Sequence, residues 1–268
     1  MNAETGAGTS AATGTGSGLL LHLTGRVVIV TGAAQGIGEA TARLCAERGA
    51  IVVMADANGE RGEVAAARLR DAGRVAEFVR TDVRDDAQVR ALVEGAVARH
   101  GRLDALVCAA GILRGAWEPI EELSLDDFDL VQDVNVRGPF LGARHAARHL
   151  EASGHGVIIV VASVAGVVAG SSSFAYGASK GGANGLGMTM GARLGDRGIR
   201  VNTVCPGNIV TEMKLSVDIA MARKAGTSAE EAIAKANRDY GTPDGVARLI
   251  AFLVSDDADH VRGNVFTR

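Results

Sequence analysis

The chain has 268 residues and a formal net charge of −3, a length that suits one α/β domain. Hydrophobic residues make up 47% and aromatic residues only 3%, so Val, Ile, Leu and Ala must build the core. The charge balance gives no basic surface for nucleic acid, and no segment approaches the ~20 apolar residues of a membrane span. Cys45, Cys108 and Cys205 lack the spacing of a metal site or a disulfide, which predicts reduced thiols in a cytoplasmic protein.

Residues 1–18 are rich in Gly, Thr, Ala and Ser and contain neither Lys nor Arg. A secretory signal needs a basic start and an apolar stretch. The composition instead predicts a disordered N-terminal tail or a remnant of cloning. We expect one folded domain over residues 19–268.

Short apolar runs recur along this domain, with helical segments between them. Such alternation predicts a parallel sheet with helices on both faces, whose ligands lie beyond the carboxyl ends of the strands. The expected strands are 27–31, 51–55, 75–80, 104–108, 157–162 and 200–204, with a weaker one near 264–266.

A glycine-rich turn from Thr31 to Gly38 follows the first strand and leads into a helix over 39–48. Glycine lets a ligand approach the main chain closely, and a helix N-terminus suits a pyrophosphate. The spacing is G-x-x-x-G-x-G, which differs from the usual dinucleotide fingerprint. Asp56 ends the second strand, where a carboxylate accepts hydrogen bonds from an adenosine ribose. The turn and Asp56 together predict a dinucleotide site.

Tyr176 and Lys180 stand four residues apart, so on a helix their side chains share one face. A cation near a phenol lowers the pKa of the phenol. Ser163, thirteen positions before Tyr176 and at the end of the fifth strand, supplies a hydroxyl that can hold a substrate oxygen. These side chains predict a general acid/base that moves a proton on or off an alcohol or carbonyl oxygen.

Asn135 lies in a helical stretch over 126–150, opened by a capping-box-like pair, Ser124 and Asp127. Gly138-Pro139 interrupt this stretch directly after Asn135, which predicts a kink there.

These motifs, in this order, resemble those of the short-chain dehydrogenase/reductase family from about Leu19 to Asn264. The resemblance implies a single-domain, Rossmann-like, doubly wound sheet of about seven strands and a catalytic tetrad of Asn135, Ser163, Tyr176 and Lys180. It also implies that the kink frees a carbonyl for a water bound to the lysine. The implied cofactor contacts are Gly32, Gln35, Gly36, Ile37, Gly38, Asp56, Asp82, Val83, Ala110, Gly111, Tyr176, Lys180, Pro206, Gly207, Ile209 and Thr211.

The choice of cofactor is argued from charge. Asp56 would repel a ribose 2′-phosphate, and the positions where phosphate-accepting relatives carry a basic residue hold Gln35 and Ala57-Asn58. Arg61, the nearest basic residue downstream, is expected on the following helix. We therefore expect NAD as cofactor, with hydride transfer between NAD(H) and a secondary alcohol or ketone.

Two other functions stay open. One is an NADPH-dependent β-ketoacyl thioester (3-oxoacyl carrier protein) reductase, for which Arg144 and Arg148 offer too small a basic patch. The other is a non-catalytic dinucleotide-binding regulator, which a complete tetrad disfavours. The sequence does not choose among acyl thioesters, sugars, steroids, terpenoid alcohols and simple diols as substrate.

A substrate lid is expected over about 211–241. Its first part offers an apolar, mobile surface, and Ser228 with Glu231 predicts a capping box that opens a helix to about Tyr240. Trp117 and Phe174 are further candidates for the pocket wall. The apolar lid residues are Met213, Leu215, Val217, Ile219 and Met221.

Four further expectations concern the scaffold. Cys108-Ala109-Ala110-Gly111 replaces the Asn-Asn-Ala-Gly of relatives, which removes asparagine contacts that brace the sheet. The glycines of the helix after Lys180 cost about 1 kcal/mol each relative to alanine, which predicts close packing by a neighbouring subunit in a homotetramer. His145 and His149 are expected on a solvated helix face, and no metal site is expected. Relatives usually continue past Arg268, so the seventh strand is either natively short or truncated.

Overall fold

Seven parallel strands form a single sheet in the computed structural model, which describes residues 22–267. The strand order is β3-β2-β1-β4-β5-β6-β7, so the winding reverses between β1 and β4, where such sheets bind ligands. All seven predicted strands are present, and the predicted fold class is confirmed. The strands are β1 (Val27–Thr31), β2 (Ile51–Asp56), β3 (Ala76–Arg80), β4 (Ala105–Cys108), β5 (Val157–Val161), β6 (Arg200–Cys205) and β7 (Gly263–Phe266).

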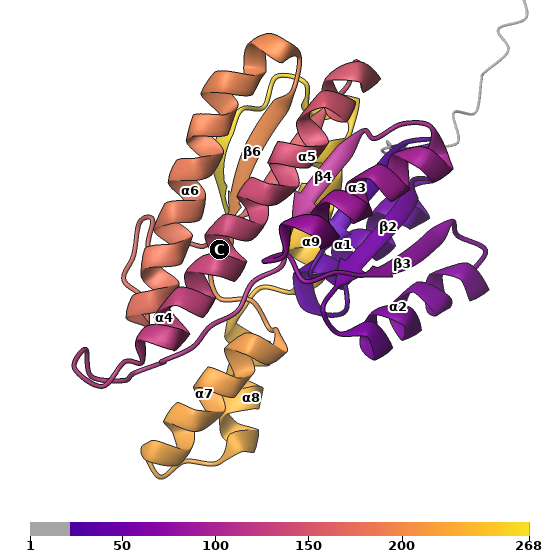
Figure 1. Cartoon of the computed structure of the whole chain (residues 1–268). Coiled ribbons are helices and arrows are strands. Elements are labelled where there is room, and N and C mark those ends of the chain that lie inside the picture. Colours follow the sequence, from indigo (N-terminus) through magenta and orange to yellow (C-terminus); the bar gives the residue numbers. More distant parts are fainter. Residues whose placement is uncertain (1–21, 268) are drawn as a thin grey trace, which may run out of the picture.

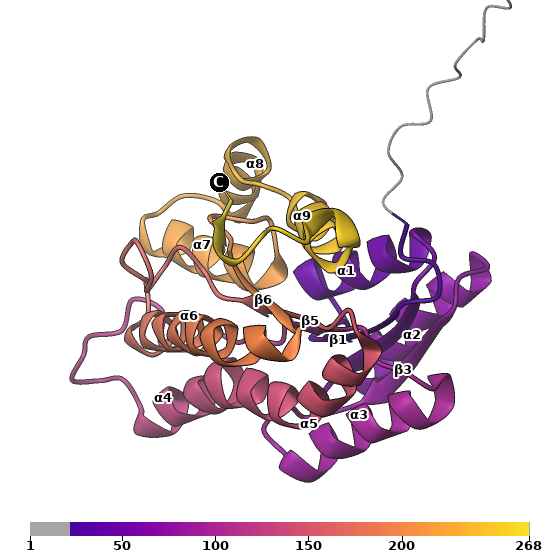
Figure 2. The same ribbon diagram turned by 90° about the horizontal axis from the view of Figure 1, so that it is seen from above.

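Helices cover both faces of the sheet (Figure 2). One face carries α1 (Gly36–Glu47), α2 (Gly59–Asp71) and α9 (Pro243–Val254). The other carries α3 (Asp86–His100), α4 (Leu125–Gln132), α5 (Gly138–Ser153) and α6 (Phe174–Leu194). Two further helices, α7 (Glu212–Lys224) and α8 (Ala229–Asp239), pack on each other and project from the body (Figure 1). The short helices are η1 (Asp133–Arg137), η2 (Gly195–Arg197) and η3 (Asp256–Ala258).

The core has two halves because successive strand residues point to opposite faces. In β1, Val28 and Val30 pack under α1 and α9, while Val27 and Ile29 pack under α3 and α5. A strand buried on both faces is apolar throughout, which is why these runs could be recognised in the sequence.

The predicted kink beside Asn135 is present as a turn of π-helix, η1, between α4 and α5. Pro139 lies in the first turn of α5. It has no N–H to donate to the carbonyl of Asn135 four residues earlier. The break therefore places Asn135 between two helices rather than inside one.

Of two predictions about the helices, the first loses part of its support and the second is wrong. Close packing within the chain explains three glycines of α6. A Cβ at Gly187 would lie 2.1 Å from Thr203 Oγ1, and a Cβ at Gly181 would lie 2.8 Å from Gly166 O. A Cβ at Gly182 would lie 3.2 Å from the Val136 side chain. This packing removes much of the argument from those glycines to a neighbouring subunit.

The second concerns His145 and His149, which do not lie on a solvated face. They lie against α3, with His145 Nε2 2.8 Å from Asp86 Oδ1 and His149 Nε2 3.5 Å from Glu94 Oε2. Their side chains are only 13% and 18% exposed. The carboxylates, distant in sequence, could not be seen from the helix alone.

The three cysteines are free and buried, and burial raises the pKa of Cys45 and of Cys108 to about 12. Across residues 22–267, no helix is long and apolar enough to cross a membrane. In the same described part, no group of three or more His, Cys, Asp or Glu side chains is placed to hold a metal ion.

Arg200 stabilises the C-terminal end of α9 from the neighbouring strand β6. Its guanidinium is 7% exposed and donates to the carbonyls of Leu253 (2.8 Å), Ser255 (2.9 Å) and Ala258 (3.4 Å). We expect Arg200→Met to lower the free energy of unfolding by about 3 kcal/mol, because buried carbonyls lose their donors. Urea denaturation measures this change.

Arg197→Met is the matched control, because Arg197 forms an exposed ion pair with Glu151. Its loss should change the free energy of unfolding by at most about 1 kcal/mol. Equal, small changes in both variants would contradict the role given to Arg200.

Candidate functional site

A cavity of about 980 Å³ opens at the carboxyl edge of the sheet. Every predicted site residue lines it except Asn135, which is buried beneath. Motifs that are far apart in sequence thus meet in one place. The predicted residues that line it are Gly32, Gln35, Gly36, Ile37, Gly38, Asp56, Asp82, Val83, Ala110, Gly111, Ser163, Tyr176, Lys180, Pro206, Gly207, Ile209 and Thr211.

The glycine turn fits a ligand that lies against the backbone. Gly32 and Gly36 have φ of 68° and 60°, in the left-handed region that favours glycine. A Cβ at Gly38 would lie 2.1 Å from Gly32 O, and one at Gly32 would lie 2.6 Å from Ala110 Cα. The turn therefore packs directly on the end of β4 and leads into the N-terminus of α1, a geometry that suits a diphosphate.

Thr31 supplies a brace between β1 and β4. Its Oγ1 donates to Val107 O (3.4 Å) and accepts from Ala110 N (3.3 Å). The loop after β4 lacks the asparagines that relatives carry there. Thr31, at the start of the glycine turn, therefore provides a hydrogen bond that holds this loop.

Two acidic residues mark the adenosine side. Asp56 accepts hydrogen bonds from Ala34 N (3.1 Å) in the glycine turn and from Asn58 N (2.9 Å). Asp82 accepts from the main-chain N (3.0 Å) and side chain of Arg84, which lowers the pKa of Asp82. The main chain thus fixes the orientation of both carboxylates at the pocket.

The N-terminal cap of α6 places Tyr176. Ser173 Oγ accepts from Tyr176 N (3.1 Å) and donates to Arg114 O (2.6 Å). A Cβ at Gly166 would lie 2.0 Å from Gly177 O, so the loop after β5 also lies against this first turn. Tyr176 therefore faces the cavity one turn before Lys180.

Lys180 and Asn135 meet below the cavity floor. Lys180 Nζ donates to Val161 O (2.8 Å) and lies 5.5 Å from the centroid of the Tyr176 ring. Asn135 donates to Ile112 O (3.0 Å) and Ser179 Oγ (2.9 Å) and accepts from Ile112 N (2.9 Å). A Cβ at Gly111 would lie 3.4 Å from both Lys180 Nζ and Asn135 Oδ1, so the two side chains converge there.

The expectation that Lys180 lowers the pKa of Tyr176 is wrong for this state of the protein. Burial raises the pKa of Tyr176 to about 12, and the nearby Ser163 hydroxyl only partly opposes this rise. Burial also lowers the pKa of Lys180 to about 8. Desolvation, which disfavours both charged forms, outweighs the attraction across 5.5 Å.

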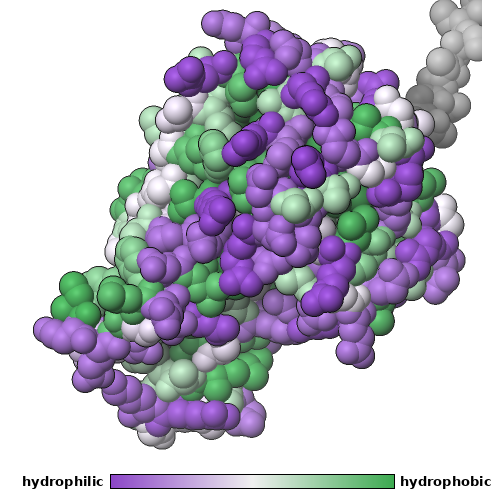
Figure 3. All heavy atoms as spheres, viewed as in Figure 1, coloured by the Kyte–Doolittle hydropathy of each residue, from purple (hydrophilic) through white to green (hydrophobic). Residues whose placement is uncertain are grey.

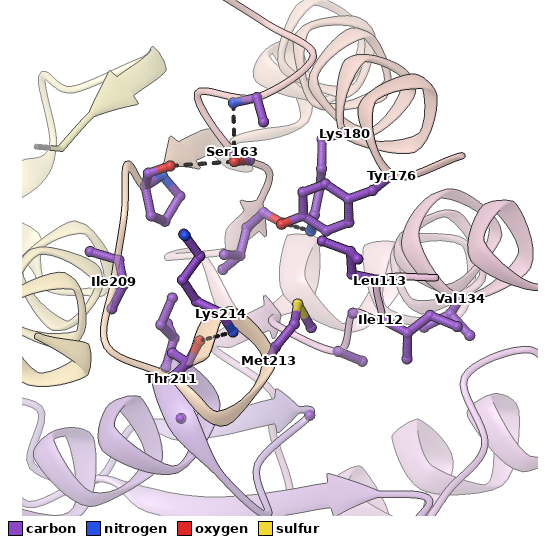
Figure 4. Close-up of a pocket in the computed structure, with 18 of the residues that line it drawn as sticks. Ile112, Leu113, Val134, Ser163, Tyr176, Lys180, Ile209, Thr211, Met213 and Lys214 are labelled. Atoms are coloured by element: carbon purple, nitrogen blue, oxygen red, sulfur yellow. Dashed lines mark hydrogen bonds between the residues drawn. The ribbon is translucent and has the colours of Figure 1, made fainter. Parts of the chain in front are cut away.

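The substrate side of the pocket lies between α6 and α7. Met213 and Lys214 lie across from Ser163 and Tyr176 (Figure 4). Sequence reasoning missed Leu113, Leu130 and Val134 on this wall, although all three line the cavity. Trp117 lines it as predicted, whereas Phe174 does not.

The first part of the segment 211–241 is a helix, α7, where the sequence indicated a mobile stretch. Thr211 caps it by accepting from Lys214 N (3.2 Å). Met213, Val217 and Met221, spaced by four residues, share its cavity-facing side; that spacing was the signal for a helix. The predicted capping box of α8, formed by Ser228 and Glu231, is confirmed.

The two ends of the segment 211–241 are joined by main-chain hydrogen bonds at Gly241, a connection that we call the neck. Gly241 N donates to Asn208 O, and Val210 N donates to Gly241 O, each at 2.9 Å. Within the segment, Lys214 pairs with Asp218 and lies 4.8 Å from the centroid of the Tyr240 ring. Tyr240 therefore packs at the end of α8, and its partner is a cation of α7.

Comparison with known proteins assigns the family. The model for short chain dehydrogenases matches residues 26–221. A cis-4-hydroxycyclohexanecarboxylate dehydrogenase of Sinomonas cyclohexanicum is 42% identical over 90% of this chain and 93% of its own. The (+)-borneol dehydrogenase 1 of Salvia officinalis is 38% identical over 90% and 91%. The crystal structure of levodione reductase aligns with a TM-score of 0.81 at 33% identity, covering 91% of this chain and 95% of that one.

The chain therefore belongs to the short-chain dehydrogenase/reductase family. Proteins of this family are oxidoreductases that use a nicotinamide dinucleotide, and the relatives above act on alcohols or ketones. The glycine turn, the N-terminus of α1 and the carboxylates of Asp56 and Asp82 described above fit such a cofactor.

Burial of Lys180 predicts a pH-dependent stability. Its pKa falls from 10.5 to about 8 on folding, so between these values the unfolded chain binds more protons and stability rises with pH. Below pH 8 the folded protein carries a buried charge. Lys180→Met should therefore stabilise the cofactor-free protein at pH 7, on the order of 2 kcal/mol after allowing for the lost hydrogen bond.

The advantage of Lys180→Met should shrink as pH rises from 8 to 10.5. Thermal unfolding of both proteins across this range measures the difference. An advantage that is constant with pH would mean that the lysine is not desolvated.

Proposed function

We propose that this protein is a dehydrogenase that transfers a hydride between NAD(H) and a secondary alcohol or ketone. The main observation is that Ser163, Tyr176 and Lys180 share one cavity with the glycine turn. The cavity thereby brings together a proton donor, a hydrogen-bond donor to the substrate oxygen and a turn that suits a diphosphate. The bound nicotinamide would supply the hydride chemistry, and the chain supplies position, charge and the proton.

Tyr176 carries the proton in this proposal. With its pKa raised to about 12, the phenol is protonated at neutral pH, which is the form that donates to a carbonyl oxygen during reduction. Alcohol oxidation needs the phenolate, and the nearby positive charge is the Lys180 ammonium, 5.5 Å from the ring centroid. Ser163 holds the substrate oxygen beside the phenol.

Lys180 and Asn135 would form the proton path behind Tyr176. Lys180 Nζ uses one of its three hydrogens on Val161 O, which leaves donors for a ribose hydroxyl and a water. Asn135, 1% exposed, does not reach the cavity. Its side chain positions the loop at Ile112, and its main-chain carbonyl, released by Pro139, is the acceptor we assign to that water.

NAD rather than NADP is the proposed cofactor. Asp56 is held by Ala34 N and Asn58 N with its charge at the pocket wall. A ribose diol donates well to such a carboxylate, whereas a 2′-phosphate is repelled by it.

The substrate is proposed to be a moderately apolar alcohol or ketone, enclosed by the segment 211–241 acting as a lid. Leu113, Val134, Met213 and Val217 line this end of the cavity. The relatives are named for hydroxycyclohexanecarboxylate, borneol and levodione, and these compounds form a suitable test panel.

The thioester reductase alternative is less well supported. Arg148 already pairs with Glu94, and neither Arg144 nor Arg148 lines the cavity. A docking surface for an acidic carrier there would not face the cavity.

Tyr176→Phe tests the function. The wild type should oxidise NADH with at least one panel ketone, and the variant should lose at least about 100-fold in kcat, the usual contribution of general acid catalysis. NADH binding, followed by fluorescence, should change less than about threefold, since this phenol hydroxyl is assigned to the reaction and Lys180 remains. Full activity of the variant would refute the assignment, and binding without turnover in the wild type would favour the regulator.

We also propose that the chain forms a homotetramer through α5 and α6. Pale and hydrophobic side chains lie along the edge formed by α6 (left in Figure 3). Phe140 of α5 and Met188 of α6 are 48% and 58% exposed. Light scattering should give four times the 27.4 kDa of one chain. Met188→Glu should give smaller species, and Val75→Glu, equally exposed but before β3, should not. A wild-type monomer would contradict this assembly.

A further inference from the structure

An ion pair joins the adenosine side of the cavity to the lid helix. Arg61 of α2 and Glu212, the first residue of α7, form a forked contact in which Arg61 Nη1 lies 2.9 Å from Oε2 and Nη2 lies 2.6 Å from Oε1. The two residues are 151 positions apart in sequence. Such a fork uses both terminal nitrogens of the guanidinium.

The ion pair lies beside the cofactor region. Glu212 lines the cavity together with Gly36, Asp56 and Ala57, and a Cβ at Gly36 would lie 3.5 Å from Thr211 Cγ2. Arg61 N donates to Asn58 Oδ1 (3.1 Å), two residues after Asp56. The hydrogen bonds and negative charge of Glu212, with smaller effects of Glu39 and Asp56, raise the pKa of Arg61.

Arg61 is therefore the cation best placed to meet a ribose 2′-phosphate at the end of β2. Guanidinium groups bind phosphate by the same fork that Arg61 now gives to Glu212. Arg80 and Arg84 also lie at this edge: Arg80 donates to Ala57 O (3.4 Å) and lies along Gly59, and Arg84 pairs with Asp82.

We propose that Glu212 is a specificity-determining residue for the cofactor: by binding both terminal nitrogens of Arg61, it withholds that guanidinium from a 2′-phosphate. This inference rests on the NAD(H) function proposed above and adds a second determinant to Asp56. The lid thereby takes part in cofactor choice as well as in substrate binding.

Glu212→Gln removes the charge of the partner while keeping its shape, and so frees Arg61. The readout is the ratio of kcat/KM for NADPH to that for NADH, with one panel ketone held constant. Because Asp56 remains and still repels phosphate, we expect this ratio to rise about tenfold, as one charge-assisted contact allows. Both side chains are exposed, so folding should be unaffected.

Two matched variants separate this mechanism from a general charge effect. Glu60→Gln removes the same charge from the residue next to Arg61, and Glu60 is exposed; the ratio should stay within about twofold, because exposed charges are screened. The double variant Glu212→Gln/Arg61→Gln should return the ratio to the wild-type value, because the gain requires the freed guanidinium.

Each result decides between the possibilities. An equal rise in Glu212→Gln and Glu60→Gln, a rise that survives in the double variant, or no rise would overturn the role of Glu212 and leave the proposed dehydrogenase intact. A wild type that already prefers NADPH would instead refute the proposed cofactor, and with it this inference. Absence of turnover with every panel ketone would refute the proposed function, and fluorescence affinities for NADPH and NADH in the same variants would then decide the role of Glu212.

Discussion

The buried ammonium of Lys180 is the constraint around which the site is arranged. A charged group out of water is unfavourable unless it is hydrogen bonded, and here the Val161 carbonyl provides the bond. That carbonyl is available because it lies at the last residue of β5. The end of a strand, the first turns of α6 and the π-turn at Asn135 therefore have to meet at one point, close to Gly111.

The same desolvation acts on the reacting group. In the protein without cofactor, the pKa of Tyr176 is raised and the pKa of Lys180 is lowered, so both groups are held nearer to neutrality than their usual values. The site is thus prepared for proton transfer by geometry rather than by a preformed phenolate. Any stabilisation of the phenolate has to arise as the cofactor and substrate complete the charge distribution.

The sequence predicted the features that depend on residues close together in the chain, and it failed for those that depend on distant residues. Strands buried on both faces, the glycine turn, the break at Gly138-Pro139 and the pair Tyr176 and Lys180 are encoded by neighbours in sequence, and all were placed. The direction of the pKa shift of Tyr176 was wrong because burial depends on the whole fold. The positions of His145 and His149 were wrong because their partners come from α3.

The helix α7 shows the same limit within the site. Its capping residue and its four-residue apolar spacing are local, yet in the sequence its apolar residues indicated a mobile surface. Few of the side chains of α7 and α8 are buried, so the pair is held to the body by the neck at Gly241 and by contacts such as Arg61 with Glu212. A unit held in this way costs little to displace. Glu212 and Met213 are adjacent on it, and both line the cavity. A displacement of this one short helix would therefore change the lining at the proposed cofactor side and at the proposed substrate side together.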